Sequence, residues 1–168
     1  MGLLIWLEAT GLADWVRGSS IGYPLMITLH AFGMAIMVGL ALALDMRLLG
    51  WFNGIPYSAL QRFLGVAWLG FGINFISGSA LFTTQSASKY VFQPGLHGME
   101  FNWVFMGKMT LVFAGAIMAA ILQTVVGRDS ATWPPTSVPA KVKVMAALSI
   151  VFWLVAITLG RLTAYLGA

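Results

Sequence analysis

Four polar or ionisable residues interrupt long apolar stretches of the sequence: His30, Asn74, Lys108 and Arg161. Such side chains are costly inside a membrane, so they usually face other helices or a wet cavity and often mark a functional site. A neutral imidazole held by a helix is a common axial ligand of haem iron, and Lys or Arg can pair with the haem propionates. The pattern therefore predicts a haem b site, with His30 on the iron and with Lys108 and Arg161 on the propionates.

The second iron ligand is open at this level. His97 is the only other histidine and could fold inward to complete a bis-His metal site with His30. Met106 and Met109 are weaker candidates, and the iron could also be five-coordinate. The absence of cysteine from the sequence excludes disulfides, thiolate metal sites and covalently attached c-type haem.

Each of these residues also has a purely structural explanation. A single membrane histidine can hydrogen-bond to a neighbouring helix, and Asn74 can do the same. Lys108 and Arg161 lie close enough to the predicted helix ends for their long side chains to reach the interface. A histidine in a glycine-rich loop, as His97 is, is commonly solvated. These readings predict helix packing without a cofactor.

The elements that would position these residues follow from composition. Apolar residues make up 60% of the 168 residues and charged residues only 8%, far below the charge content of soluble domains. The charges are clustered, which leaves four stretches near the length that a helix needs to cross a bilayer, at about 21–44, 63–84, 103–127 and 144–165. We expect one all-α domain spanning 1–168, an integral membrane four-helix bundle.

The segment before the first stretch, about 3–17, has apolar residues at helical spacing with charges between them. This pattern predicts an N-terminal interfacial amphipathic helix lying on the membrane surface. The alternative is a disordered start. No basic region precedes the apolar residues, so a secretory signal peptide is not expected.

Orientation follows from the positive-inside rule. The predicted first and third loops hold most of the basic residues: Arg47, Arg62, Arg128, Lys141 and Lys143. We therefore expect a multi-pass protein of the bacterial inner membrane with both termini and the loop at about 85–102 in the periplasm. All four intramembrane polar residues then fall in the outer half, and the inner half is expected to be plain packing. These basic loops account for most of the net charge of +4, so no nucleic-acid partner is expected.

A resemblance supports part of this interpretation. The stretch Tyr23-Pro24-Leu25-Met26-Ile27-Thr28-Leu29-His30-Ala31-Phe32-Gly33, continuing to Asp45-Met46-Arg47-Leu48-Leu49-Gly50, resembles the first helix of small bacterial four-helix membrane proteins. It is more distantly similar to the copper-resistance D-type and four-helix protoporphyrinogen oxidase group. Residues 103–111 also resemble the third helix of that group. The resemblance implies haem b bound through histidine, and it matches at His30 and Lys108. The other helical histidines of the oxidases have no counterpart, so oxidase activity is not implied.

Two functions are therefore expected as alternatives. The first is a haem b-binding electron-transfer component that works with a quinone, an outer redox partner or a larger membrane complex. The second is a non-catalytic accessory subunit that binds no haem and packs against lipids and other membrane subunits. A copper-handling role ranks below both, because two histidines and no cysteine are poor copper ligands. No nucleophile-base pair or phosphate-binding loop is present, so we do not expect an enzyme acting alone.

Overall fold

The computed structural model describes residues 1–133 and 138–165. Their order along the chain is α1 (Gly2–Glu8), α2 (Gly11–Gly18), α3 (Gly22–Leu48), α4 (Tyr57–Thr84), the π-helical turn η1 (Ser86–Tyr90), β1 (Phe92–Gly95), β2 (Gly98–Phe101), α5 (Trp103–Asp129), the short turn η2 (Ser130–Thr132) and α6 (Ala140–Tyr165). The helices α3, α4, α5 and α6 are each long and apolar enough to cross a membrane. This confirms the prediction of four long apolar helices among the described residues, which is typical of a multi-pass membrane protein.

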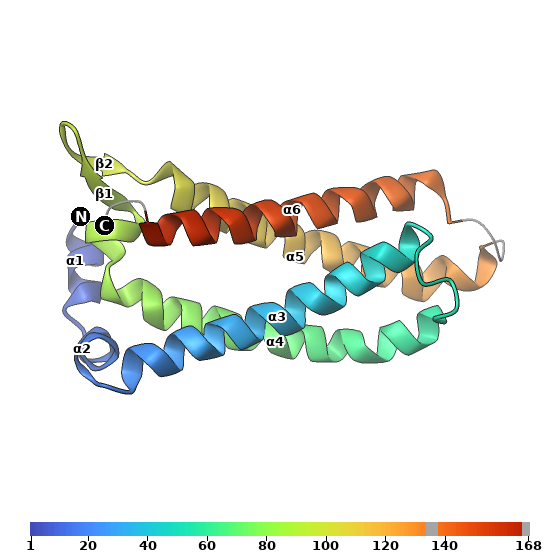
Figure 1. Ribbon diagram of the computed structural model, residues 1–168, viewed down its shortest axis with the longest axis horizontal. Coiled ribbons are helices and arrows are strands. Elements are labelled where there is room, and N and C mark those ends of the chain that lie inside the picture. The colour runs from blue at the N-terminus through green and yellow to red at the C-terminus, as the bar shows by residue number, and fades with distance from the viewer. Residues whose placement is uncertain (134–137, 166–168) are drawn as a thin grey trace.

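The long helices run along a common axis and pack in pairs. Helix α3 lies along α4, α5 lies along α6, and α3 also contacts α6 (Figure 1). Helices α1 and α2 and the strands β1 and β2 gather at one end, which we call the hairpin end. The connection from α3 to α4 lies at the other end, which we call the opposite end. The start of α1 and the end of α6 share the hairpin end (Figure 1).

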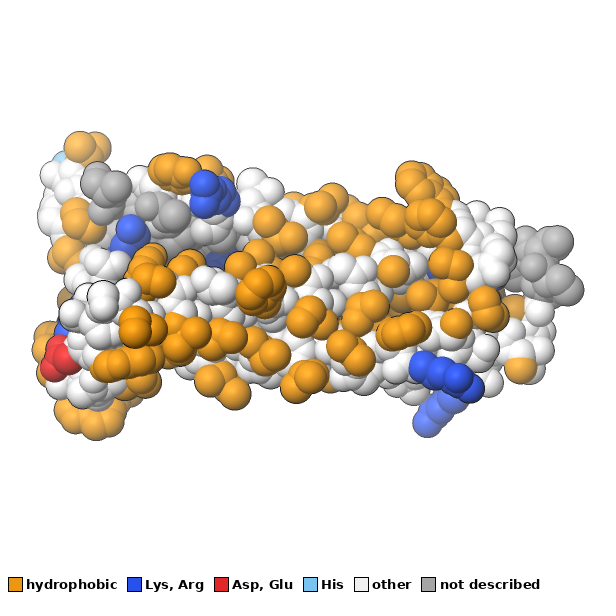
Figure 2. Space-filling view, turned by 60° about the horizontal axis from the view of Figure 1, so that its bottom comes forward, with side chains coloured by type: hydrophobic (Ala, Val, Ile, Leu, Met, Phe, Trp, Pro, Cys, Tyr) orange, Lys and Arg blue, Asp and Glu red, His pale blue; other side chains and the backbone are white. Residues whose placement is uncertain are grey.

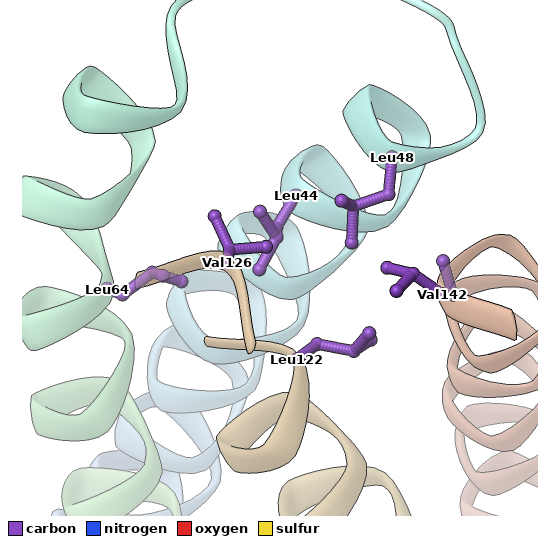
Figure 3. Close-up of a cluster of buried hydrophobic side chains, with 7 residues drawn as sticks. Leu44, Leu48, Leu64, Leu122, Val126 and Val142 are labelled. Atoms are coloured by element: carbon purple, nitrogen blue, oxygen red, sulfur yellow. The ribbon is translucent and has the colours of Figure 1, made fainter. Parts of the chain in front are cut away.

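The interior is apolar along most of its length. One buried cluster toward the opposite end takes side chains from all four long helices (Figure 3): Leu44, Leu48, Leu64, Leu122, Val126, Val142 and Ala146. A second cluster comprises Met37, Val38, Ala41, Ala67, Ala116 and Trp153. Apolar side chains also cover much of the outer surface between the two ends (Figure 2). Charged side chains are concentrated toward the ends (Figure 2). An apolar outer belt of this kind suits contact with lipid.

The helices are longer than the predicted apolar stretches. Helix α4 begins at Tyr57, so Arg62 lies inside it, and α3 continues to Leu48 with Asp45 and Arg47 in its last turns. Gaps between charges mark the part of a helix that lies in hydrocarbon, whereas helical hydrogen bonding continues into the interface. The helices therefore extend beyond the predicted apolar stretches at the opposite end.

The predicted single N-terminal helix is wrong in detail, because the segment forms two helices rather than one helix or a disordered start. The break falls at Thr10, whose Oγ1 accepts from the Ala13 amide at 3.3 Å and donates to the Leu7 carbonyl at 2.8 Å. A threonine side chain that bonds the backbone in this way starts a helix. Helix α2 buries Ala13 and Val16 completely, and Val16 packs on α4.

The expectation of an all-α chain needs one correction. Residues 92–101, predicted as loop, form an antiparallel hairpin in which Phe92 pairs with Phe101 and Gly95 with Gly98. Two residues, Leu96 and His97, connect the strands. Gly98 has a φ of +115°, a conformation that favours glycine. The sequence shows too short an alternation here to indicate strands.

Candidate functional site

His30 and Asn74 join α3 to α4 through two reciprocal hydrogen bonds. The His30 ring nitrogen Nδ1 lies 3.0 Å from the Asn74 carbonyl oxygen, and the Asn74 side-chain amide donates to the His30 carbonyl at 2.8 Å. A carbonyl can only accept, so Nδ1 carries the proton and Nε2 of a neutral ring is left with its lone pair. The sequence placed the two residues at similar depth, and the fold brings them into direct contact.

Glycines allow the two helices to come this close. A Cβ atom on Gly33 would lie 2.5 Å from the Asn74 amide nitrogen and 2.6 Å from the Gly70 carbonyl oxygen. A Cβ atom on Gly78 would lie 2.8 Å from Cε1 of the His30 ring. Small residues at helix contacts permit such backbone approach in membranes. The imidazole therefore lies against the bare backbone of α4 at Gly78.

Ser77 lies beside this contact without competing for it. Its hydroxyl is 3.4 Å from His30 Nδ1 but only 2.6 Å from the Ile73 carbonyl of its own helix, to which it donates. Serine in a helix commonly bonds backward in this way. The orientation of His30 is thus set by the Asn74 backbone rather than by a side chain.

Lys108 enters the same half of the molecule from α5. Its Nζ lies 5.6 Å from the centroid of the Phe105 ring, and its stem passes Gly160 of α6, where a Cβ would be 3.4 Å from Cε. The Phe105 ring in turn stacks on Phe82, one turn beyond Gly78 on α4, at 5.8 Å between centroids. Within residues 1–133 and 138–165, Lys108 forms no ion pair.

The other two predicted residues are both exposed. Arg161 is exposed, and its guanidinium lies 5.3 Å from the Tyr165 ring centroid. His97 is exposed in the turn of the hairpin, whose tip points away from α3 (Figure 1). The fold therefore joins His30 with Asn74 and places Lys108 in the same half, while His97 lies apart in the hairpin turn and Arg161 follows Gly160, which the Lys108 stem passes. Among the described residues, no three His, Asp or Glu side chains form a metal-binding group.

The hydrogen bond of His30 Nδ1 has the donor chemistry of a metal-binding histidine. Histidines that bind metal commonly donate one ring N–H to a backbone carbonyl, which fixes the tautomer and presents the other nitrogen to the metal. The Nδ1 contact with Asn74 matches that arrangement and leaves Nε2 as the donor atom.

Polar contacts that the sequence did not predict close the hairpin end. Arg17 donates to the carbonyls of Thr84, at 3.0 Å, and of Glu8, at 2.6 Å. Oε1 of Glu8 accepts from the backbone amides of Ala87 and Ser88, at 2.8 and 3.1 Å. These contacts attach both N-terminal helices to the end of α4 and to η1. Charges between apolar residues hinted at an interface here, but their partners are about 80 positions away along the chain.

Three aromatic side chains pack together at the hairpin end. Tyr90 packs between Phe82 and Phe105, at 5.8 and 5.0 Å between ring centroids. Burial raises the pKa of the Tyr90 phenol above its usual value, so the hydroxyl stays neutral. Asn102, fully buried, holds the start of α5 here by accepting from the Phe105 amide at 2.9 Å. The hairpin end is thus a packed, mostly apolar cap.

Asp45 is a further residue that the sequence reading missed. It was counted among the charges that flank the first spanning stretch, yet it is only 1% exposed. The available signal was its position one turn after Ala41 and three residues before Leu48, on a face that proves to be buried.

Comparisons of the chain with protein-family models, with curated proteins and with solved structures found no match, so the site rests on its own geometry.

Proposed function

We propose that this protein is a haem b-binding electron-transfer component of the bacterial inner membrane, in which Nε2 of His30 would bind the iron. The observation that carries the proposal is the 3.0 Å contact between His30 Nδ1 and the Asn74 carbonyl. That contact leaves Nε2 as the free donor, as in metal-binding histidines with an oriented ring. The distant similarity of residues 23–33 to the four-helix protoporphyrinogen oxidase group, which implies haem b, points the same way.

In this proposal the chain itself supplies binding and orientation. His30 holds the iron, Asn74 fixes the ring, and the Lys108 ammonium neutralises a propionate charge. Bound haem would supply one-electron transfer, with a quinone or a periplasmic redox protein as partner. Because His97 lies at the hairpin tip, the proposed site does not use it, and the iron would be held by His30 alone or by His30 with Met106 or Met109 of α5.

The proposed membrane arrangement is a four-helix bundle with the hairpin end in the periplasm. Support comes from the basic residues of the opposite end, which the positive-inside rule assigns to the cytoplasm. The exposed side chains of Leu3, Trp6 and Trp15 would lie in the outer interface, because aromatic and apolar residues of short helices favour that layer. Both termini are then periplasmic.

Optical spectroscopy tests the haem proposal. Protein expressed with ample haem and purified in mild detergent should show a Soret band and, after reduction, a b-type α-band. His30→Ala should remove or shift both bands, whereas His97→Ala, at an exposed position, is the matched control and should leave them unchanged. Circular dichroism of each variant verifies that the helices persist. A colourless, fully helical wild-type protein would exclude haem binding.

One observation favours the alternative, an accessory membrane subunit without haem. The bonds between His30 and Asn74 are reciprocal, so each side chain already has a structural use in holding α3 against α4. A helix clamp of this kind needs no ligand. The colourless outcome above, with His30→Ala lowering only stability and with co-purification of a defined membrane partner, would support this function.

A further inference from the structure

The carboxyl group of Asp45 is buried in an apolar part of α3 without a charged partner. The residue is 1% exposed, and its Oδ2 has no hydrogen-bond partner among the described residues. On its own helix it follows Ala41 and Leu44, members of the two buried apolar clusters. A carboxylate in such surroundings costs several kcal/mol, on the order of the whole stability of a small domain, unless it is paired or neutralised.

The polar groups around Asp45 are uncharged. From α6 it faces Ser149, which is fully buried and whose hydroxyl also lacks a partner. From α4 and α5, Trp68 and Gln123 line the same small void as Asp45, and the Trp68 indole N–H donates to the Gln123 side-chain oxygen at 2.8 Å. The remaining lining of the void is apolar.

The charged and titratable groups nearby along the chain are engaged elsewhere. Arg47 donates to the Ile55 carbonyl at 2.8 Å and to the Asn53 side chain at 3.0 Å, and its guanidinium lies 4.3 Å from the Tyr57 ring centroid. In the described part of the chain the one ion pair joins Arg17 to Asp14 at the hairpin end. The basic residues of the other helices at the opposite end, Arg62, Arg128, Lys141 and Lys143, therefore leave Asp45 unpaired.

The void beside Asp45 limits what can bind there. Its volume of about 10 Å³ is at the lower limit for one water molecule. A metal cation would need several oxygen ligands, whereas this site offers one carboxylate, one serine hydroxyl and an amide oxygen already bonded to Trp68. A proton needs only the carboxylate itself, with Ser149 or one water as the hydrogen-bond partner of the acid.

We propose that Asp45 is an intramembrane proton-binding site: its carboxylate takes a proton from water at the opposite end and holds it as a carboxylic acid among uncharged side chains. One oxygen–hydrogen bond forms on the carboxylate, and hydronium is left as water. Asp45 lies three residues before the end of α3, so the exchange path is about one helical turn, roughly 5 Å. The proposal does not depend on whether His30 binds haem.

Dicyclohexylcarbodiimide tests the site, because this apolar reagent adds to protonated carboxyls in apolar surroundings and leaves a stable acylurea. The intact protein in lipid nanodiscs is labelled at a series of pH values and analysed by peptide mass spectrometry. We expect labelling of Asp45 that is lost as the pH rises and is absent in Asp45→Asn. Asp14 and Glu100, which are exposed, serve as internal controls and should react instead with a water-soluble carbodiimide.

Infrared difference spectroscopy gives a readout that does not depend on reagent access. The carbonyl stretch of a carboxylic acid should be present at neutral pH in the wild type and in Ser149→Ala, and it should be lost in Asp45→Asn. Absence of that band from the wild type would overturn the proposal. If sodium chloride, but not choline chloride, protects Asp45 from labelling, that result would also overturn the proposal and would identify a cation site.

Discussion

Replacing Gly33 by alanine should separate α3 from α4. The added Cβ would lie 2.5 Å from the Asn74 amide nitrogen, where ordinary contact begins at 3.4 Å, so the backbones must move apart by the difference, about 0.9 Å. The obstacle is backbone on both sides, which cannot rotate away as a side chain could. The same movement, directed along the two hydrogen bonds of His30 and Asn74, would lengthen them from 3.0 and 2.8 Å beyond bonding range.

The cost can be estimated from those two effects. Overpacking of a tight contact costs about 1–3 kcal/mol. Loss of two hydrogen bonds within a membrane adds about 1 kcal/mol, taking about 0.6 kcal/mol for each. The free energy of unfolding of Gly33→Ala should therefore fall by about 2–4 kcal/mol.

The assay is reversible unfolding in mixed detergent micelles, followed by tryptophan fluorescence and circular dichroism. Gly39→Ala is the matched control, because it lies in the same helix and a Cβ there would meet nothing within 4 Å. Subtracting its effect removes the difference in helix propensity between glycine and alanine. If the two variants differ by less than about 0.5 kcal/mol, roughly the scatter of surface substitutions, the close approach at Gly33 does not hold the pair together.

Two further predictions concern polar contacts. Asn74→Leu removes the side-chain bond to the His30 carbonyl but keeps the backbone carbonyl that orients the ring, so it should lower the free energy of unfolding by about 1 kcal/mol while preserving any haem spectrum that His30 supports. A haem spectrum lost in Asn74→Leu would mean that the side chain, not the backbone, orients His30. Glu8→Ala removes the acceptor of the Ala87 and Ser88 amides and should increase hydrogen exchange across α1 and η1, because the helix loses its attachment. Asp14→Asn is its control, since that carboxylate is 70% exposed and pairs only with Arg17, and equal exchange in the two variants would contradict the role assigned to Glu8.

The sequence predicted the spanning helices well because their signal is local. Charges such as Arg17 and Lys89 bound apolar stretches, and the cost of charge in hydrocarbon turns that spacing into helices. The same signal placed the start of α4 near 63 instead of Tyr57, since a helix can carry Arg62 once it reaches the interface. Propensity and spacing therefore indicate how many helices there are more reliably than where each one ends.

Contacts across the fold were accessible only in part. The depth of His30 and Asn74 along their helices follows from counting residues, but the acceptor role of the Asn74 backbone requires the close approach at Gly33 and Gly78. The spacing of Asp45 from Ala41 and Leu48 places it on one face of α3 with them, but only the packing of α3 against the other helices shows that this face is buried. The partner of Glu8 lies in η1, beyond two long helices, and no local pattern indicates it.

The paired arrangement of the helices has a consequence for synthesis. The tight contact at Gly33, Gly70 and Asn74 lies entirely between α3 and α4, which are joined by a short connection. This first helix pair can therefore pack together while α5 is still inside the ribosome. Helices α5 and α6 then need to dock on the packed pair α3 and α4, so the order of assembly follows the order of translation.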